Sequence, residues 1–283
     1  MSARKEDYDS PVENHWCPGC GNFGILTAVR RALVELDLPP QRVLICSGIG
    51  QAPKLPHYLR VNTLNGLHGR EVASATAAKL CAPDLTVLVH AGDGGAYGEG
   101  GNHLLHAIRR DIDITLVVHD NKVYGLTKGQ ASPTTSLGEP AKIHPRGVPS
   151  RPLNPLALAI ALECGFVAQA LSSRTDQLVD ILQCAVRHRG FSLVNVLQPC
   201  VSWDKTRTYA FYDEHCAPVP ADHDPADAIA AFRLAAQRTF WLGILHQRAG
   251  TPFDERVLPA GRGPLRDLGV EPERVGRIVG RFR

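Results

Sequence analysis

Two apolar segments, each followed directly by polar residues, constrain the fold of this 283-residue chain more than any other feature. Residues 85–90 and 112–119 are too apolar for strands with one exposed face, so they predict strands buried on both faces of a parallel sheet. Residues 99–110, between them, carry apolar side chains at helical spacing. Strand, helix and strand in succession predict an α/β fold, with a mostly parallel central sheet flanked by helices.

Polar residues stand where each of these strands ends. Gly92, Asp93 and Gly94 follow the first strand, and Asn121 follows the second. Ligands of open α/β sheets bind beyond the carboxyl ends of the strands, and carboxylate and amide oxygens are ligands that Mg²⁺ accepts beside phosphate. Both sequences are also common in ordinary turns. Their matching positions on two neighbouring strands favour a site for a cation and a diphosphate.

The glycines around Asp93 do not have the spacing of a dinucleotide-binding turn. An aspartate in the middle of the first glycine triplet would repel a pyrophosphate unless a cation lay between them. The sequence therefore favours metal-mediated diphosphate binding over binding of NAD.

The rest of the chain continues the α/β pattern as far as Trp203. We expect helices at 22–36, 71–80, 156–163 and 175–188, strands at 43–46, 166–170 and 192–197, and a long loop at 129–152. Residues 1–203 are therefore predicted to form one domain, and 204–283 a C-terminal extension. Within the extension, 226–247 predicts a helix or a pair of helices. Residues 261–283 are either a solvated tail or a docking segment for another subunit.

Composition excludes several classes of function. The net charge is +3, from 31 Lys and Arg against 28 Asp and Glu, and no basic stripe with aromatic residues predicts nucleic-acid binding. The chain shows no signal peptide and no membrane-spanning stretch, which predicts a cytoplasmic protein. In that compartment the eight cysteines are expected to be buried thiols or metal ligands rather than disulfides.

The aspartate and asparagine motif resembles the thiamine diphosphate motif, and six further blocks narrow the resemblance. Their order resembles that of the β subunit of 2-oxoacid:ferredoxin oxidoreductases. The blocks are WCPGCGN (16–22), SGIG (47–50), LHGR (67–70), GGNH (100–103), YGLTKGQ (124–130) and QPC (198–200). The resemblance implies a thiamine diphosphate-binding fold, with thiamine diphosphate, Mg²⁺ and a [4Fe-4S] cluster as cofactors.

The resemblance also assigns roles to residues. Asp93, Asn121 and the Val123 carbonyl would bind Mg²⁺. His68 would contact the substrate or a reaction intermediate, and Lys54 and Lys128 could pair with a substrate carboxylate or with CoA. Without the resemblance, a lone histidine is more often structural and the lysines are surface charges. The cofactor-binding set that it implies is Gly48, Ile49, Gly50, His68, Gly92, Asp93, Gly94, Gly95, Asn121, Val123, Gly125 and Leu126.

Cys17 and Cys20 have the Cys-x-x-Cys spacing of a metal-binding turn, although a thioredoxin-like redox pair has the same spacing. The resemblance implies that they bind the cluster together with Cys200. Many relatives carry a further cysteine where this chain has Gln51. Cys46 would lie on the order of 15 Å from that position along an extended chain. The fourth ligand is left open, with Cys46 as a weak candidate, and the alternative is an absent or altered cluster.

The function implied is oxidative decarboxylation of a 2-oxoacid with CoA, giving acyl-CoA, CO₂ and reduced ferredoxin. The wording GIGQAPKLPHYL (48–59) resembles members that act on 2-oxoglutarate; pyruvate and branched-chain or aryl 2-oxoacids are alternatives. A separate α subunit would supply the glutamate that activates the cofactor, in an αβ or (αβ)₂ assembly. The rival hypotheses are a non-oxidative thiamine diphosphate-dependent decarboxylase and a non-catalytic metal-binding or scaffold subunit.

Overall fold

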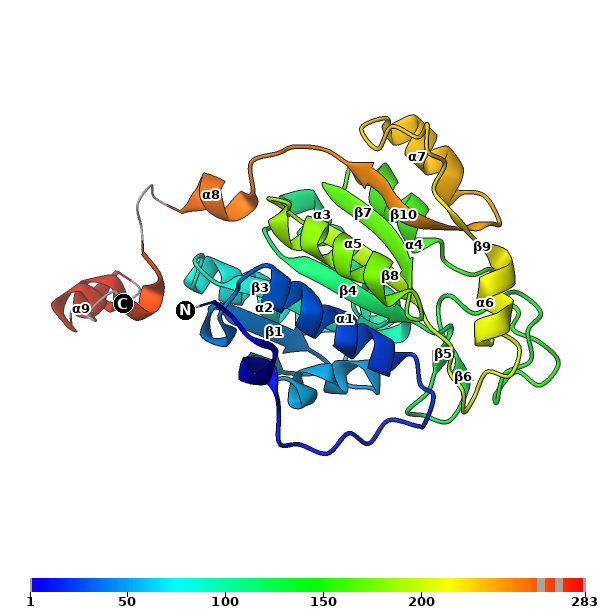
Figure 1. The fold of residues 1–283 in the computed structure, drawn as a ribbon. Helices are drawn as coiled ribbons and strands as arrows, with labels where there is room; N and C mark the ends of the chain where they lie inside the picture. Colours follow the sequence, from blue (N-terminus) through cyan, green and yellow to red (C-terminus); the bar gives the residue numbers. More distant parts are fainter. Residues whose placement is uncertain (1, 259–262, 268–271, 282–283) are drawn as a thin grey trace.

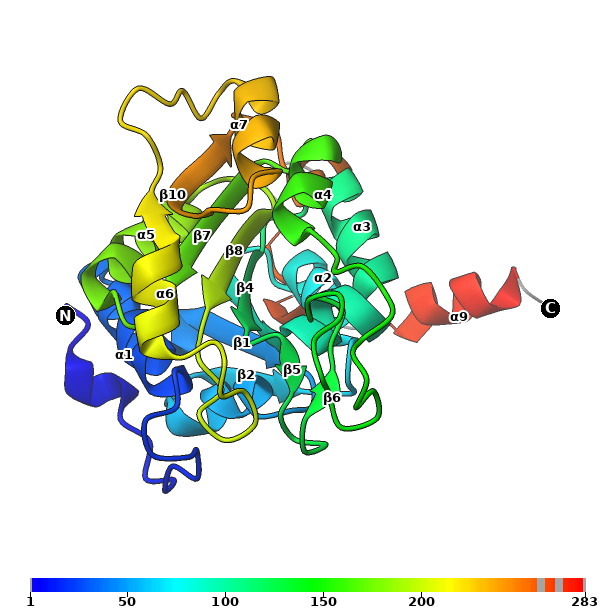
Figure 2. The ribbon, with the colours of Figure 1, turned by 90° about the vertical axis from the view of Figure 1, so that its right-hand side faces the viewer.

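One sheet of eight strands organises the computed structural model, which describes residues 2–258, 263–267 and 272–281. The strand order is β2-β1-β3-β4-β8-β7-β10-β9 (β2 is labelled in Figure 2, the other strands in Figure 1). All neighbouring strands run parallel except β10, which is antiparallel to β7. The strands are β1 (Val43–Ser47), β2 (Asn62–Asn65), β3 (Thr86–Gly92), β4 (Thr115–Asp120), β7 (Phe166–Leu171), β8 (Ser192–Leu197), β9 (Cys216–Pro218) and β10 (Phe240–Gln247). The predicted α/β fold is confirmed.

Helices cover both faces of the sheet, as Figures 1 and 2 show. On one face lie α1 (Asn22–Glu35) and α5 (Thr175–Arg187). On the other lie α2 (Glu71–Cys81), α3 (Gly101–Arg110), α4 (Pro155–Ala161) and α7 (Ala228–Ala235). Successive strand residues point to opposite faces, so Ile45 packs with α1 and α5 while Leu44 and Cys46 pack with α2 and α3. This double coverage explains why the central strands are apolar throughout.

Shorter elements connect and extend these layers. A two-stranded hairpin of β5 (Val123–Tyr124) and β6 (Gln130–Ala131) opens the long loop, and a π-helical turn, η4 (Gly94–Glu99), leads from β3 into α3. The other short helices are η1 (Lys5–Tyr8), η2 (Pro40–Arg42), η3 (Ala52–Tyr58), α6 (Tyr209–His215), α8 (Phe253–Val257), η5 (Leu265–Asp267) and α9 (Pro272–Gly280). No helix in the described ranges is long and apolar enough to cross a membrane.

The structure corrects two expectations for the C-terminal part. Residues 226–247 are not helical throughout, because α7 ends at Ala235 and Phe240–Gln247 form strand β10. Gly243 has a φ of +140°, which a helix does not accommodate. The predicted boundary after Trp203 does not separate two folded units either, since β10 pairs with β7 inside the same sheet. Of the tail at 261–283, residues 261–262, 268–271 and 282–283 lie outside the described residues.

Candidate active site

A cavity of about 360 Å³ lies where β1, β3 and β4 end. Because these strands are parallel, the segments that follow them meet at one edge of the sheet even though they are far apart in sequence. Most of the predicted site residues line this cavity. They are Cys17, Cys20, Ile49, Gly50, His68, Gly92, Asp93, Gly94, Gly95, Asn121, Val123, Gly125, Leu126 and Cys200.

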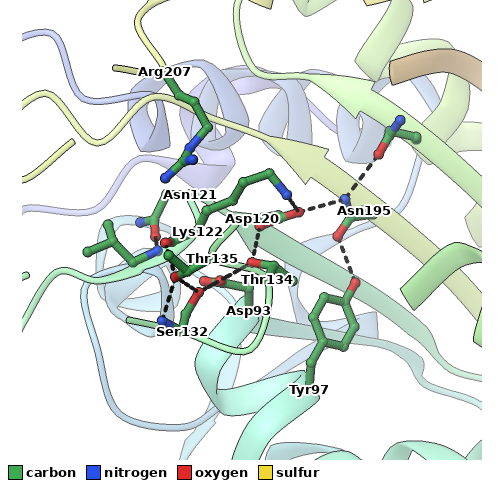
Figure 3. A network of polar contacts seen from close by, with 12 residues as sticks. Asp93, Tyr97, Asp120, Asn121, Lys122, Ser132, Thr134, Thr135, Asn195 and Arg207 are labelled. Atoms are coloured by element: carbon green, nitrogen blue, oxygen red, sulfur yellow. Dashed lines mark hydrogen bonds and ion pairs between the residues drawn. The ribbon is translucent and has the colours of Figure 1, made fainter. Parts of the chain in front are cut away.

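Asp93 occupies the base of the cavity and is only 2% exposed. The hydroxyl groups of Ser132 and Thr134 both donate to its Oδ2, at 2.5 and 2.6 Å (Figure 3). Burial, and secondarily the charge of Asp120, raises the pKa of Asp93 to about 7. A divalent cation would offset both causes, so this buried carboxylate fits a site that a cation completes.

Asp120 is the second buried carboxylate, at the end of β4. Thr134 Oγ1 lies 2.9 Å from its Oδ1, while Asn195 Nδ2 and Lys122 Nζ each lie 3.2 Å from its Oδ2 (Figure 3). The Thr134 hydroxyl carries one proton and faces both carboxylates, so it cannot donate fully to both at once. Asn195 and Lys122 stabilise the charge of Asp120 in addition. Asp93 has no such ion-pair partner among the described residues, so its ionised form is the less favourable of the two.

The turn after β4 fixes the predicted amide ligand. Lys122 adopts a left-handed φ of 58°, and the Val123 N–H donates to Asn121 Oδ1 at 3.1 Å. The Thr135 hydroxyl donates to the Lys122 carbonyl at 2.7 Å and ties this turn to the long loop. Asn121 and Val123 therefore stand in a braced turn at the cavity wall, where their oxygens could reach a cation held by Asp93.

His68 is held between two oxygen atoms. Its Nδ1 lies 2.8 Å from the Ile49 carbonyl, and its Nε2 lies 3.0 Å from Oε2 of Glu99. A carbonyl can only accept, so Nδ1 donates and Nε2 is the nitrogen that faces the Glu99 carboxylate. Tyr124 donates to the same Glu99 oxygen at 3.0 Å. The ring is thus oriented from both sides, and an anionic ligand could meet it only at Nε2, in place of Glu99.

Three cysteines share one wall of the cavity. Cys17 is exposed, Cys20 and Cys200 are half-buried, and Ser202 Oγ donates to Cys17 Sγ at 2.9 Å. Burial raises the pKa of Cys20 to about 11, and the neighbouring Cys200 and Cys17 add to the rise. Among the described residues, no three His, Cys, Asp or Glu side chains form a ready-made metal site. The three cysteines nevertheless line the same cavity.

Cys46, the weak candidate for the fourth ligand, lies apart from the other three cysteines. It is fully buried in the hydrophobic cluster between the sheet and helices α2 and α3, and it does not line the cavity. Burial raises the pKa of its thiol to about 12. Strand β1 places this side chain in the core, so its position along the sequence near Gln51 does not bring it to the other cysteines.

Three other predicted residues also lie off the main cavity. Lys54 is half-buried on η3, and Gly48, which lies next to Glu71, does not line the cavity. Lys128 is exposed and lines a separate open hollow together with Lys142 and Trp203. In this chain alone, neither lysine is placed against the reacting end of a ligand bound beside Asp93.

The sequence did not identify the hydroxyl groups of Ser132 and Thr134, or Glu99 and Tyr124. Ser132 and Thr134 come from the long loop, whose many hydroxyl residues were a general signal without a specific position. Glu99 stands directly before the block that begins at Gly100, and Tyr124 begins another block. Those two could have been singled out as side chains inside segments already predicted to be functional.

Comparison with known proteins agrees with this geometry. Residues 47–196 match the family described as thiamine pyrophosphate enzyme, C-terminal TPP binding domain. Residues 200–260 match the family that describes the C-terminal part of the pyruvate ferredoxin oxidoreductase beta chain. The first match covers β1, β3 and β4 and the cavity-lining loops that follow them, and the second begins at Cys200.

Individual relatives carry a consistent name. The chain is 45% identical to the 2-oxoacid:ferredoxin oxidoreductase subunit beta of Sulfolobus sp, over 88% of this chain and 87% of that protein. It is 46% identical to 2-oxoacid:ferredoxin oxidoreductase 1, subunit beta, of Aeropyrum pernix, over 73% of this chain and 65% of that protein. A solved 2-oxoglutarate:ferredoxin oxidoreductase from Magnetococcus marinus, with 2-oxoglutarate, coenzyme A and succinyl-CoA bound, superposes with a TM-score of 0.89. Its identity is 34%, over 98% of this chain and 96% of that one.

Proposed function

The chain belongs to the family of 2-oxoacid:ferredoxin oxidoreductase β subunits, and from this premise we propose that it acts in the CoA-dependent oxidative decarboxylation of 2-oxoglutarate. Its relatives are thiamine diphosphate-dependent oxidoreductases whose β subunit works with an α subunit. The observation that carries the proposal is a single cavity lined both by Asp93 and Asn121 and by three cysteines. Cofactor chemistry and electron exit can then occur side by side. The substrate choice rests on the Magnetococcus marinus enzyme, which binds 2-oxoglutarate.

Asp93, Asn121 and the Val123 carbonyl would hold Mg²⁺, and the cation would in turn hold the diphosphate. Both hydroxyl donors of Asp93 bind its Oδ2, which leaves Oδ1 for the cation. Gly94 and Gly95 follow at the start of η4, where backbone N–H groups would approach phosphate oxygens. Charge balance supports this arrangement, because the buried Asp93 carboxylate gains the countercharge that it otherwise lacks.

Thiamine diphosphate, when bound, supplies the carbanion that attacks the keto carbon and accepts the electrons released with CO₂. The residues of this chain orient the substrate and exclude water. His68, fixed by Ile49 and Glu99, would bind the carboxylate of the 2-oxoacid. Lys54 and Lys128 would act only at a greater distance, on a second carboxylate or on the phosphates of CoA.

Cys17, Cys20 and Cys200 would bind a [4Fe-4S] cluster that passes electrons to ferredoxin. Thiolates are the ligands that such a cluster uses, and the three cysteines line the same cavity, which supports the proposal. Gln51 also lines that wall, and the fourth ligand remains unassigned. An α subunit would complete the centre with the glutamate that activates the cofactor, in an αβ or (αβ)₂ assembly.

Reconstitution with the α subunit tests the proposal. The complex is supplied with Mg²⁺, thiamine diphosphate and CoA, and viologen reduction and CO₂ release are followed over a panel of 2-oxoacids. We expect both signals to require CoA and to be fastest with 2-oxoglutarate. Release of CO₂ without viologen reduction would instead identify a non-oxidative decarboxylase. A rate that is highest with pyruvate or an aryl 2-oxoacid would overturn the substrate assignment.

A further inference from the structure

Glu71, the first residue of α2, is a buried acid next to the cavity that the proposed reaction does not use. Its side chain is 2% exposed, and its Oε2 has no hydrogen-bond partner within the described part of the chain. Burial raises the pKa of Glu71, opposed by the charge of His68 and by backbone N–H groups at the start of α2. Burying a carboxyl group in this environment lowers the stability of the folded protein.

Two glycines of the proposed cofactor site make room for this carboxylate. A methyl group placed at Gly48 would lie 2.4 Å from Glu71 Oε2, and one placed at Gly95 would lie 3.0 Å from Glu71 Oε1. The methyl group at Gly95 would also lie 3.4 Å from Cε1 of His68. The carboxylate is therefore wedged between the loops after β1 and β3, beside the His68 ring.

The charged environment of His68 is then acidic on two sides. Glu71 is buried near the ring, and the Glu99 carboxylate lies at Nε2. The Tyr124 hydroxyl donates to that same carboxylate. Glu99 is about half exposed, so solvent screens its charge, whereas the charge of Glu71 acts through the protein interior. Of the two acids, Glu71 is the one whose charge His68 experiences with little screening.

We propose that Glu71 is a positioning residue, whose buried carboxylate packs against the loops after β1 and β3 and so keeps His68 oriented toward the carboxylate of the 2-oxoacid. The proposal rests on the proposed function, because it assumes that His68 meets that carboxylate. A purely structural acid at this position would be expected to find partners for both oxygens. The unpartnered oxygen lies against a loop of the proposed cofactor site and lowers the stability of the fold. Such a destabilising group at a candidate site indicates a functional role.

The test is a double-mutant cycle of Glu71→Gln and His68→Gln in the complex with the α subunit. We expect Glu71→Gln to raise the KM for the 2-oxoacid about tenfold and to leave the KM for CoA unchanged. A change of about tenfold is typical of residues that act through another residue. In the His68→Gln background the same change should have no further effect, because the residue through which it acts is gone. Multiplying effects in the double variant, or an unchanged KM in Glu71→Gln, would overturn the inference.

Thermal unfolding separates positioning from support of the fold. Replacing a buried, partly unpartnered carboxylate by a neutral amide of the same shape should raise the melting temperature of Glu71→Gln or leave it unchanged. Glu35→Gln, the same change at the exposed end of α1, is the matched control for both assays. A clear fall in melting temperature with normal kinetics would assign Glu71 a structural role. If the parent complex turns over no 2-oxoacid, it is the proposed function that fails.

Discussion

Removing the Thr134 hydroxyl is the most direct test of whether hydrogen bonds keep Asp93 ionised for the proposed cation. Thr134 is 2% exposed and lies 2.6 Å from Asp93 and 2.9 Å from Asp120, so it is the one side chain that bridges both buried carboxylates in the described structure. Thr134→Val keeps the shape of the side chain and removes the donor. Asp93 then keeps only the Ser132 hydroxyl and faces Asp120 with less shielding. We therefore expect its ionised, metal-binding form to become less favourable.

The size of the effect follows from the lost bond. A hydrogen bond to a charged group contributes about 1.5–3 kcal/mol, and the lower end applies because Ser132 still donates to the same oxygen. A loss of about 1.5 kcal/mol corresponds to roughly tenfold weaker Mg²⁺-dependent cofactor binding. Calorimetric titration of thiamine diphosphate into the complex, at several Mg²⁺ concentrations, measures this directly.

The matched control is Thr115→Val, which removes a buried hydroxyl from β4. Among the described residues, that hydroxyl donates only to the Ala185 carbonyl, at 3.3 Å. Both variants should lose some thermal stability. The control should bind Mg²⁺ and cofactor as the parent does, and only Thr134→Val should bind weakly. Equal cofactor affinity in Thr134→Val and the parent would refute the reasoning that Asp93 depends on this donor.

Two further predictions concern protons and cysteines. The pKa of Asp93 is about 7 in the folded protein against 3.8 ordinarily, so folding is favoured at low pH and this contribution is lost as the pH rises toward 7. The melting temperature of the cofactor-free protein should therefore fall between pH 5 and pH 7 by an amount that Asp93→Asn abolishes; an equal fall in that variant would contradict the assignment. Ser in place of Cys17, Cys20 or Cys200 should lower the iron and sulfide content of anaerobically purified complex, whereas Cys46→Ala should not. Equal iron in all four variants would argue against the cluster assignment.

The sequence was a good guide to residues that follow strands directly. Asp93 and Asn121 could be placed because a strand fixes the position of the next few residues, and parallel strands bring their ends together. His68 was singled out only through the family resemblance, because no strand was predicted before it. Thr134 could not be placed in this way, because it reaches Asp93 from a long loop without periodicity. Spacing along the chain left Cys46 a weak candidate, and it could not tell on which face of β1 the side chain lies, because successive residues of a strand point to opposite faces of the sheet.

Strand β10 shows a different limit. Residues 226–247 are apolar enough for a helix, and only the conformation of Gly243 and the pairing of β10 with β7 decide otherwise. Both are consequences of tertiary structure. The edge of a sheet can recruit an apolar segment from the end of a chain, and the segment itself gives little sign of this beforehand.

A buried ion network links the loop that supports Asp93 to the segment that follows Cys200. Arg207 forms short ion pairs with both carboxylate oxygens of Glu139 and lies 2.7 Å from Asp204. Glu139 belongs to the long loop that supplies Thr134, while Asp204 and Arg207 belong to the segment that follows Cys200. All three side chains are largely shielded from water, so losing one would leave an opposite charge buried without its partner. Movement of the cysteine segment is therefore resisted by the loop that supports Asp93, and the two parts of the proposed reaction share one structural support.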